Sequence, residues 1–136
     1  VLFRSLFTSK DSFIQKKKTG LQEKIDEIDS QMESMKKEHL ISLREVDAVF
    51  VDMEGNYSIH HYGDAQLSDW LKRNISSKNR KAYEQRRQNL EAKLSDGLIA
   101  CERHKEDIKL EIQKLNQKRL AEIIDRDNIR FLHCRQ

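Results

Sequence analysis

The sequence predicts a mainly α-helical fold in which two long helices form an antiparallel coiled-coil hairpin. The 136 residues include no proline and only four glycines, so little in the chain interrupts a long helix. Charged residues make up 36% and hydrophobic residues 37%, which is little apolar side chain for a thick core. Apolar residues also recur at alternating steps of three and four. We therefore expect residues 1–136 to form a single elongated domain.

The first long helix is predicted over residues 11–46. Its apolar stripe consists of Ile14, Leu21, Ile25, Ile28, Met32 and Met35. These residues follow the spacing of a coiled-coil seam. At His39 a polar residue takes a position that the heptad would give to an apolar one, and Leu40 and Leu43 continue the stripe in a shifted register. We therefore expect a local stutter near His39.

A small β-hairpin followed by a short helix is predicted over residues 47–76, where the chain turns between the long helices. β-Branched and aromatic residues with a period close to two lie on both sides of Gly55: Val49, Phe50, Val51, Tyr57, Ile59 and Tyr62. Glycine supplies the positive φ that a tight hairpin turn requires. Asp64 is a suitable N-cap for the short helix, and we expect Trp70 on its apolar face to cover the hairpin.

The second long helix is predicted over residues 77–125. Its stripe consists of Tyr83, Leu90, Leu94, Leu98, Cys101, Ile108, Ile112, Leu115 and Ile123. Gly97 interrupts the middle of this stretch, and it is consistent with a close helix contact, a kink or a break. Residues 129–134 alternate in the manner of a strand, so a terminal β-strand is predicted there.

The predicted order of a long helix, a β-hairpin and a long helix is similar to the topology of prefoldin subunits and of other stalk-like chaperone or adaptor proteins. The similarity is one of architecture, without a shared motif. The short helix around Trp70 and the strand at residues 129–134 depart from that topology. A likeness of this kind guides the expected fold and not the function.

A basic segment between residues 72 and 87 contains seven basic side chains and one acidic one. The basic residues are Lys72, Arg73, Lys78, Arg80, Lys81, Arg86 and Arg87. Such a segment could bind the phosphates of a nucleic acid, with Tyr83 adding a stacking surface. The alternative is charge matching within the hairpin, because residues 21–54 hold ten acidic and four basic residues. We favour charge matching, and nucleic-acid binding stays the alternative function.

A second apolar face is predicted on the C-terminal helix. The residues expected to contact a partner are Leu98, Ile99, Leu110, Leu120 and Ile124. Most of them fall outside the main stripe, and helices with more than one apolar stripe usually bury the extra surface against another chain. We therefore predict a non-enzymatic coiled-coil interaction or scaffold module that forms a homodimer or docks on another protein. The methionines and the aromatic residues of the tip are a further candidate surface.

No pattern of catalytic or metal-ligating residues is present in the sequence. The candidate zinc ligands are His60, His61, Cys101, His104, His133 and Cys134. Their spacing lacks the paired short intervals of zinc sites, so no metal is expected. There is also no nucleophile beside a base and no glycine-rich phosphate loop. We expect neither an enzyme nor a bound cofactor.

The remaining expectations concern location and context. No run approaches the roughly 18 apolar residues of a membrane helix, so no membrane insertion is expected. Two widely spaced cysteines do not indicate a disulfide scaffold, which favours the cytoplasm or the nucleus. The sequence begins at Val1 and not at a methionine. A third hypothesis is therefore a regulatory or sensor segment of a larger multidomain protein.

Overall fold

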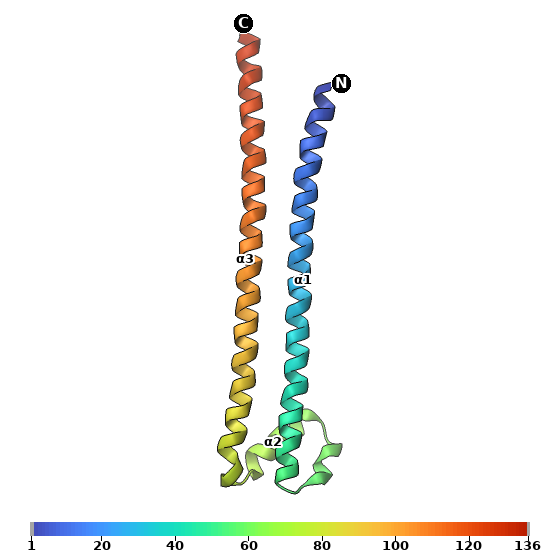
Figure 1. Ribbon diagram of the computed structural model, residues 1–136, viewed down its shortest axis with the longest axis vertical. Helices are drawn as coiled ribbons and strands as arrows, with labels where there is room; N and C mark the ends of the chain where they lie inside the picture. The colour runs from blue at the N-terminus through green and yellow to red at the C-terminus, as the bar shows by residue number, and fades with distance from the viewer. Residues whose placement is uncertain (1, 136) are drawn as a thin grey trace. The chain divides into compact units, whose positions relative to one another are not determined.

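A computed structural model describes the backbone of residues 2–135 and the side chains of residues 12–127. Its elements are α1 (Leu2–Met53), the 3-10 helix η1 (Tyr57–His61), α2 (Asp64–Asn74) and α3 (Ser77–Arg135), as Figure 1 shows. The mainly α-helical class is therefore confirmed. The chain divides into two compact units, of which unit 1 contains residues 1–30 and 101–136 and unit 2 contains residues 31–100.

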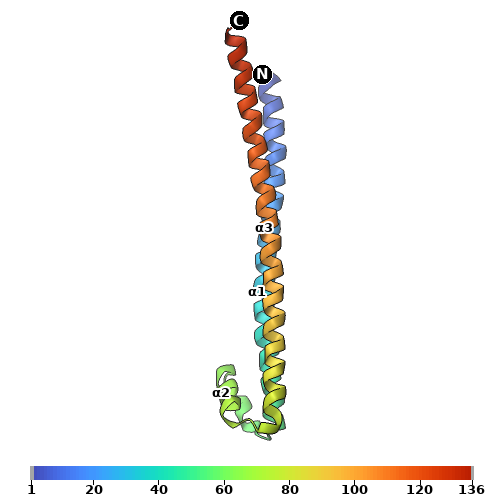
Figure 2. The same ribbon diagram turned by 90° about the vertical axis from the view of Figure 1, so that its left-hand side faces the viewer.

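Unit 1 pairs the first part of α1 with the last part of α3, and the two segments lie side by side in both ribbon views (Figures 1 and 2). The buried side chains of this pair are Ile14, Leu21, Ile25, Ile28, Cys101 and Ile108. All six belong to the stripes predicted from spacing. Lys105 lies between Cys101 and Ile108 on α3, and its Nζ is 2.6 Å from Oδ1 of Asp29 on α1. This hydrogen bond raises the pKa of Lys105.

Unit 2 contains the second part of α1 and the first part of α3, which run antiparallel. Asp47 pairs with Arg87, and Met35 pairs with Gly97, so residue numbers fall on α3 as they rise on α1. A Cβ added at Gly97 would lie 3.2 Å from Sδ of Met35. Because α3 is continuous through this position, Gly97 serves a close helix contact and marks neither a break nor a separate helix.

The burial pattern does not follow the stutter predicted near His39. His39 is half-buried between the helices, whereas Leu40 is 63% exposed. Of the two leucines expected to continue the stripe, only Leu43 is half-buried. The heptad spacing from Met32 and Met35 therefore continues through the histidine.

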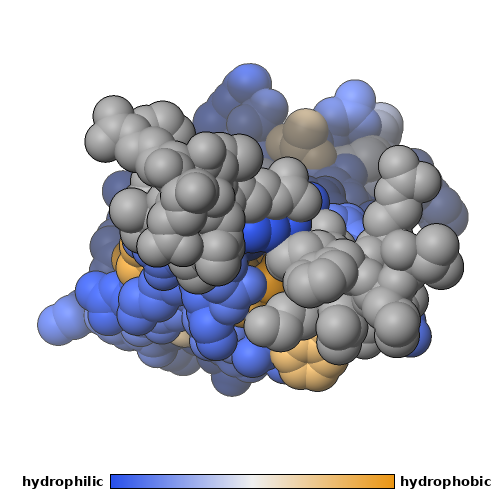
Figure 3. Space-filling view, turned by 90° about the horizontal axis from the view of Figure 1, so that it is seen from above, coloured by the Kyte–Doolittle hydropathy of each residue, from blue (hydrophilic) through white to orange (hydrophobic). Residues whose placement is uncertain are grey.

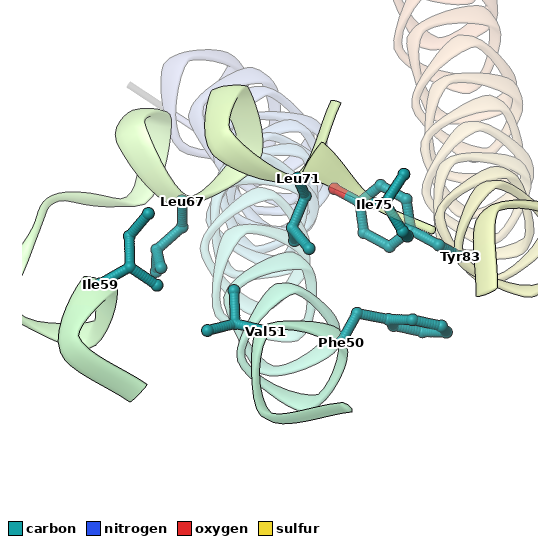
Figure 4. Close-up of a cluster of buried hydrophobic side chains, with 7 residues drawn as sticks. All are labelled: Phe50, Val51, Ile59, Leu67, Leu71, Ile75 and Tyr83. Carbon is teal, nitrogen blue, oxygen red and sulfur yellow. The ribbon is translucent and has the colours of Figure 1, made fainter. Parts of the chain in front are cut away.

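A cluster of buried side chains closes unit 2 at the end where α1 passes into α2 and α3 (Figure 4). Its members are Phe50, Val51, Ile59, Leu67, Leu71, Ile75 and Tyr83. They come from all four elements of the unit, and Leu67, Leu71 and Val51 are the most completely enclosed. Trp70 is half-buried and packs against the cluster. Replacement of an enclosed leucine by alanine typically lowers the free energy of unfolding by about 2–5 kcal/mol. Leu67 and Leu71 therefore hold α2 firmly on α1.

The β-hairpin predicted within residues 47–76 is wrong, because α1 continues to Met53 and η1 replaces the second strand. Gly55 has a φ of 73°, but it uses that conformation to end a helix. Its N–H donates to the carbonyl of Asp52 at 3.0 Å, and the N–H of Asn56 donates to that of Val51 at 3.3 Å. These two bonds form the Schellman motif, which requires the same positive φ as a hairpin turn.

The terminal strand predicted over residues 129–134 is also wrong, because α3 continues to Arg135. A strand needs a second strand to satisfy its backbone N–H and C=O groups, and no strand occurs among residues 2–135. The start of the chain is helical from Leu2. A helix satisfies the same groups within its own segment, so short alternation does not decide the conformation. Without strands, the topological similarity to prefoldin subunits is lost as well.

Substitution by alanine should have opposite effects on stability at Gly20, within α1, and at Gly55, in the turn that ends α1. A Cβ at Gly20 would meet nothing within 4 Å, so Gly20→Ala should stabilise the chain by about 1 kcal/mol through helix propensity. Gly55→Ala should destabilise it by about 1–2 kcal/mol, because alanine resists the positive φ. Urea unfolding followed by circular dichroism measures both changes. Equal effects of the two substitutions would contradict the helix-stop role of Gly55.

Candidate interaction surfaces

A buried carboxylate joins α1 to the basic segment of α3. Asp47 is 3% exposed, and its Oδ1 accepts hydrogen bonds from Oη of Tyr83 at 2.7 Å and from Nη1 of Arg87 at 2.9 Å. The Arg87 guanidinium also lies 5.6 Å from the centroid of the Tyr83 ring. Burial and the bond to Asp47 raise the pKa of Tyr83 to about 12. Tyr83 therefore belongs to the core, and it does not provide the stacking surface predicted for it.

A second carboxylate, that of Glu54, holds the start of α3. Its Oε1 accepts hydrogen bonds from the N–H of Ser76 at 3.1 Å, from Oγ of Ser76 at 2.9 Å and from Nδ2 of Asn79 at 2.9 Å. The side-chain bonds with Asn79 and Ser76, followed by the Ser76 N–H bond, lower the pKa of Glu54. A negative charge here also interacts favourably with the positive end of the helix dipole.

The basic segment is only partly used by the fold. Arg87 pairs with Asp47, and the guanidinium of Arg86 lies 5.8 Å from the centroid of the Phe50 ring. The other five basic residues are exposed and form no ion pair among the residues whose side chains are described: Lys72, Arg73, Lys78, Arg80 and Lys81. Charge matching within the chain therefore accounts for Arg87 and leaves most of the segment facing solvent.

Two hollows lie on either side of the last turn of α2, where the basic segment begins. The smaller has a volume of about 270 Å³, and its lining includes Lys72 and Arg80 together with Glu84. The larger has a volume of about 500 Å³, and its lining includes Trp70 and Arg73. Sequence reasoning did not find these hollows, because they depend on how α2 packs on α1.

The predicted apolar face of α3 is largely exposed. Ile99, Leu110, Leu120 and Ile124 are 48%, 53%, 58% and 51% exposed, whereas Leu98 is half-buried. In Figure 3 the coloured surface is mainly hydrophilic, with hydrophobic residues at separate places. Leu110, Leu120 and Ile124 belong to unit 1, whereas Ile99 belongs to unit 2.

The candidate metal ligands lie in several elements. His60 and His61 belong to η1, and Nε2 of His60 is 2.6 Å from Oδ1 of Asp52. Cys101 is buried in unit 1 and His104 is exposed, while the side chains of residues 133 and 134 lie outside the described range. Among the residues described, no three His, Cys, Asp or Glu side chains gather in a way that could hold a metal ion.

None of the described helices contains a stretch that is both long and apolar enough to cross a membrane. Comparisons with protein-family models, with curated proteins and with solved structures found no match.

The bonds to Glu54 predict a pH-dependent stability. Because its pKa is lowered from the ordinary value of 4.5, the contribution of Glu54 is present above that pH and is lost as the pH falls through the folded-state pKa. Glu54→Gln should therefore lower the melting temperature at pH 7, and this difference from the wild type should shrink as the pH falls progressively below 4.5. Glu23→Gln, at an exposed position of α1, is the matched control. A deficit that stays the same across this range would contradict the role of the charge.

Proposed function

We propose that the chain is a non-enzymatic helical interaction module that associates with a second copy of itself through α3. The supporting observation is the exposure of Leu110, Leu120 and Ile124, at 53%, 58% and 51%, on a helix that already buries another stripe against α1. Large apolar side chains repeated along one helical stripe are typical of a surface that a partner covers.

The order of residues along this stripe favours a second copy as the partner. Positions 110, 113, 117 and 120 follow the alternating heptad steps of a seam and hold Leu, Gln, Gln and Leu. The pattern reads the same in both directions. In an antiparallel two-fold arrangement, Leu110 of one copy therefore faces Leu120 of the second, and Gln113 faces Gln117. Self-complementarity of this kind is what a two-fold interface requires.

The energy available from this stripe indicates a weak dimer. A half-exposed leucine gains roughly 1 kcal/mol when it is covered, so four leucines contribute about 4 kcal/mol. That gain only offsets the lowest estimates of the cost of association, about 4 kcal/mol, so the net affinity has to come from the remaining packing along the stripe. The arrangement also brings the two copies of Lys114 close to the symmetry axis. We therefore expect association at high protein concentration, strengthened by added salt.

The leucine pair provides the test of self-association. The double variant Leu110→Ser, Leu120→Ser should remove the concentration-dependent dimer in sedimentation equilibrium while leaving helical content nearly unchanged, since both side chains are exposed. The matched control is Leu40→Ser, Ile41→Ser, in which residues 63% and 59% exposed on α1 are changed. A wild-type chain that stays monomeric at every concentration, or a variant that dimerises equally well, would exclude the proposal.

A second candidate function is nucleic-acid binding by the basic segment. It is favoured by the five exposed basic side chains that form no ion pair within the described residues. Exposed lysine and arginine side chains without an ion pair can displace the counterions of a phosphate backbone. The release of those counterions drives binding at low salt. The exposed apolar stripe of unit 1 and this segment involve different residues, so each function can be tested without disturbing the other.

Removal of charge from the start of α3 tests the second candidate. The triple variant Lys78→Gln, Arg80→Gln, Lys81→Gln should weaken binding to an oligonucleotide at about 50 mM salt, because up to three phosphate contacts are lost. The slope of log affinity against log salt should fall by about 2 to 3. The control Lys16→Gln, Lys17→Gln removes exposed charge from unit 1 and should leave the slope unchanged. Absence of wild-type binding at low salt would rule out the function.

A further inference from the structure

The larger of the two hollows at α2 combines aromatic, amide and basic side chains. Its volume is about 500 Å³, and its lining includes Tyr62, Trp70, Arg73, Asn56 and Asn74. Sites for small organic groups usually have a volume of about 300–1,000 Å³ and combine apolar walls with a few polar groups. The hollow is therefore large enough to hold a planar ring such as a nucleobase together with its sugar.

The aromatic walls are held by the fold and still reach solvent. Trp70 is half-buried against the core cluster, and the carbonyl of the same residue accepts a hydrogen bond from Nδ2 of Asn74 at 2.9 Å. Tyr62 is 56% exposed, and its N–H donates to the carbonyl of Ile59 at 3.0 Å. An anchored indole and an exposed phenol are the kind of surfaces on which unpaired bases stack.

The polar lining suits the edge of a base better than a phosphate. Nδ2 of Asn74 is occupied by the carbonyl of Trp70, while Oδ1 of Asn56 accepts from Oγ of Ser58 at 2.8 Å, so each amide keeps its other polar atom for a ligand. Asp69 also lines the hollow. A carboxylate accepts hydrogen bonds from an N–H group on the edge of a base, such as N3–H of thymine, whereas it repels a phosphate.

Phosphates have a separate place on the other side of the same helical turn. Three basic residues, Lys72, Arg80 and Arg87, line the smaller hollow with two acidic ones, Glu84 and Glu91, whereas the charges of Arg73 and Asp69 cancel in the larger hollow. Lys72 and Arg80 form no ion pair among the described side chains. Lys72 and Arg73 are consecutive in α2, so the basic segment borders both hollows. A nucleic-acid strand that crosses the last turn of α2 would therefore have basic side chains near its phosphates and the aromatic hollow near one of its bases.

We infer that unit 2 binds single-stranded nucleic acid, with one unstacked base in the hollow between Tyr62 and Trp70 and the backbone on the basic segment. The inference rests on the second candidate function and goes beyond it, because charge alone does not distinguish one strand from two. In a duplex the bases stay stacked and paired, and a flipped base must first be extracted. A single strand offers the base without that cost.

Trp70 is the only tryptophan of the chain, so its fluorescence reports directly on the hollow. Titration of the full chain with oligo(dT) at about 50 mM salt should quench this emission as the base stacks on the indole. A blunt duplex of the same length should bind more weakly and leave the emission nearly unchanged. Tyr62→Ala should weaken oligo(dT) binding about tenfold, with little effect on duplex binding. Tyr57→Ala is the matched control, because Tyr57 is 66% exposed and does not line the hollow.

The outcomes separate this inference from the function on which it rests. If single strands and duplexes bind equally, and neither quenches Trp70, the base site is excluded while electrostatic binding by the basic segment stands. If heparin competes as well as oligo(dT) does and Tyr62→Ala has no effect, the base site is again excluded. If no nucleic acid binds at low salt, both proposals fail. Circular dichroism of Tyr62→Ala shows whether the fold is retained, which the exposure of this residue leads us to expect.

Discussion

The carboxylate of Asp47 is buried between α1 and α3, where Tyr83 and Arg87 supply its two hydrogen bonds. Breaking a buried pair by removing one partner typically costs about 3–5 kcal/mol, since the remaining charge is left without compensation. Aliphatic side chains tolerate a shift of one helical turn, but such a shift would move both donors away from this carboxylate. The register of the helix pair in unit 2 therefore depends on Asp47 more than on any of its apolar contacts.

The packing at the end of unit 2, where α1 passes into α2 and α3, depends on that register. With Tyr83 opposite Asp47, the Phe50 and Tyr83 rings meet edge to face at 5.2 Å, and Glu54 reaches the first turn of α3. Leu67 and Leu71 then fix α2 over the same cluster, and the pair formed by Arg44 and Asp64 joins the start of α2 to α1. The hollows beside α2 exist because these contacts hold its last turn at the surface.

The parts of the fold that depend on local spacing could be predicted from the sequence, whereas those that depend on packing could not. The seams follow from steps of three and four, which need no knowledge of the partner. The β-hairpin was predicted because Gly55 suits two kinds of turn and because the β-branched and aromatic residues on both sides of it have a period close to two. The hollow was missed for another reason: Tyr62 and Trp70 are eight residues apart and share it only through the fold of η1 and α2.

The position of each basic residue relative to the seam explains how the basic segment is divided. Arg87 follows Tyr83 by four residues and precedes Leu90 by three, so it occupies a seam position and its charge is used inside the fold. Lys78 and Lys81 fall off that spacing and remain exposed. Arg80 keeps the spacing, three residues before Tyr83, but it lies in the first turn of α3 and is also exposed. Arg87, Lys78 and Lys81 each carry one positive charge, and their different burial follows from their helical phase. A basic run on a paired helix is therefore best divided by heptad position before any of it is assigned to a ligand.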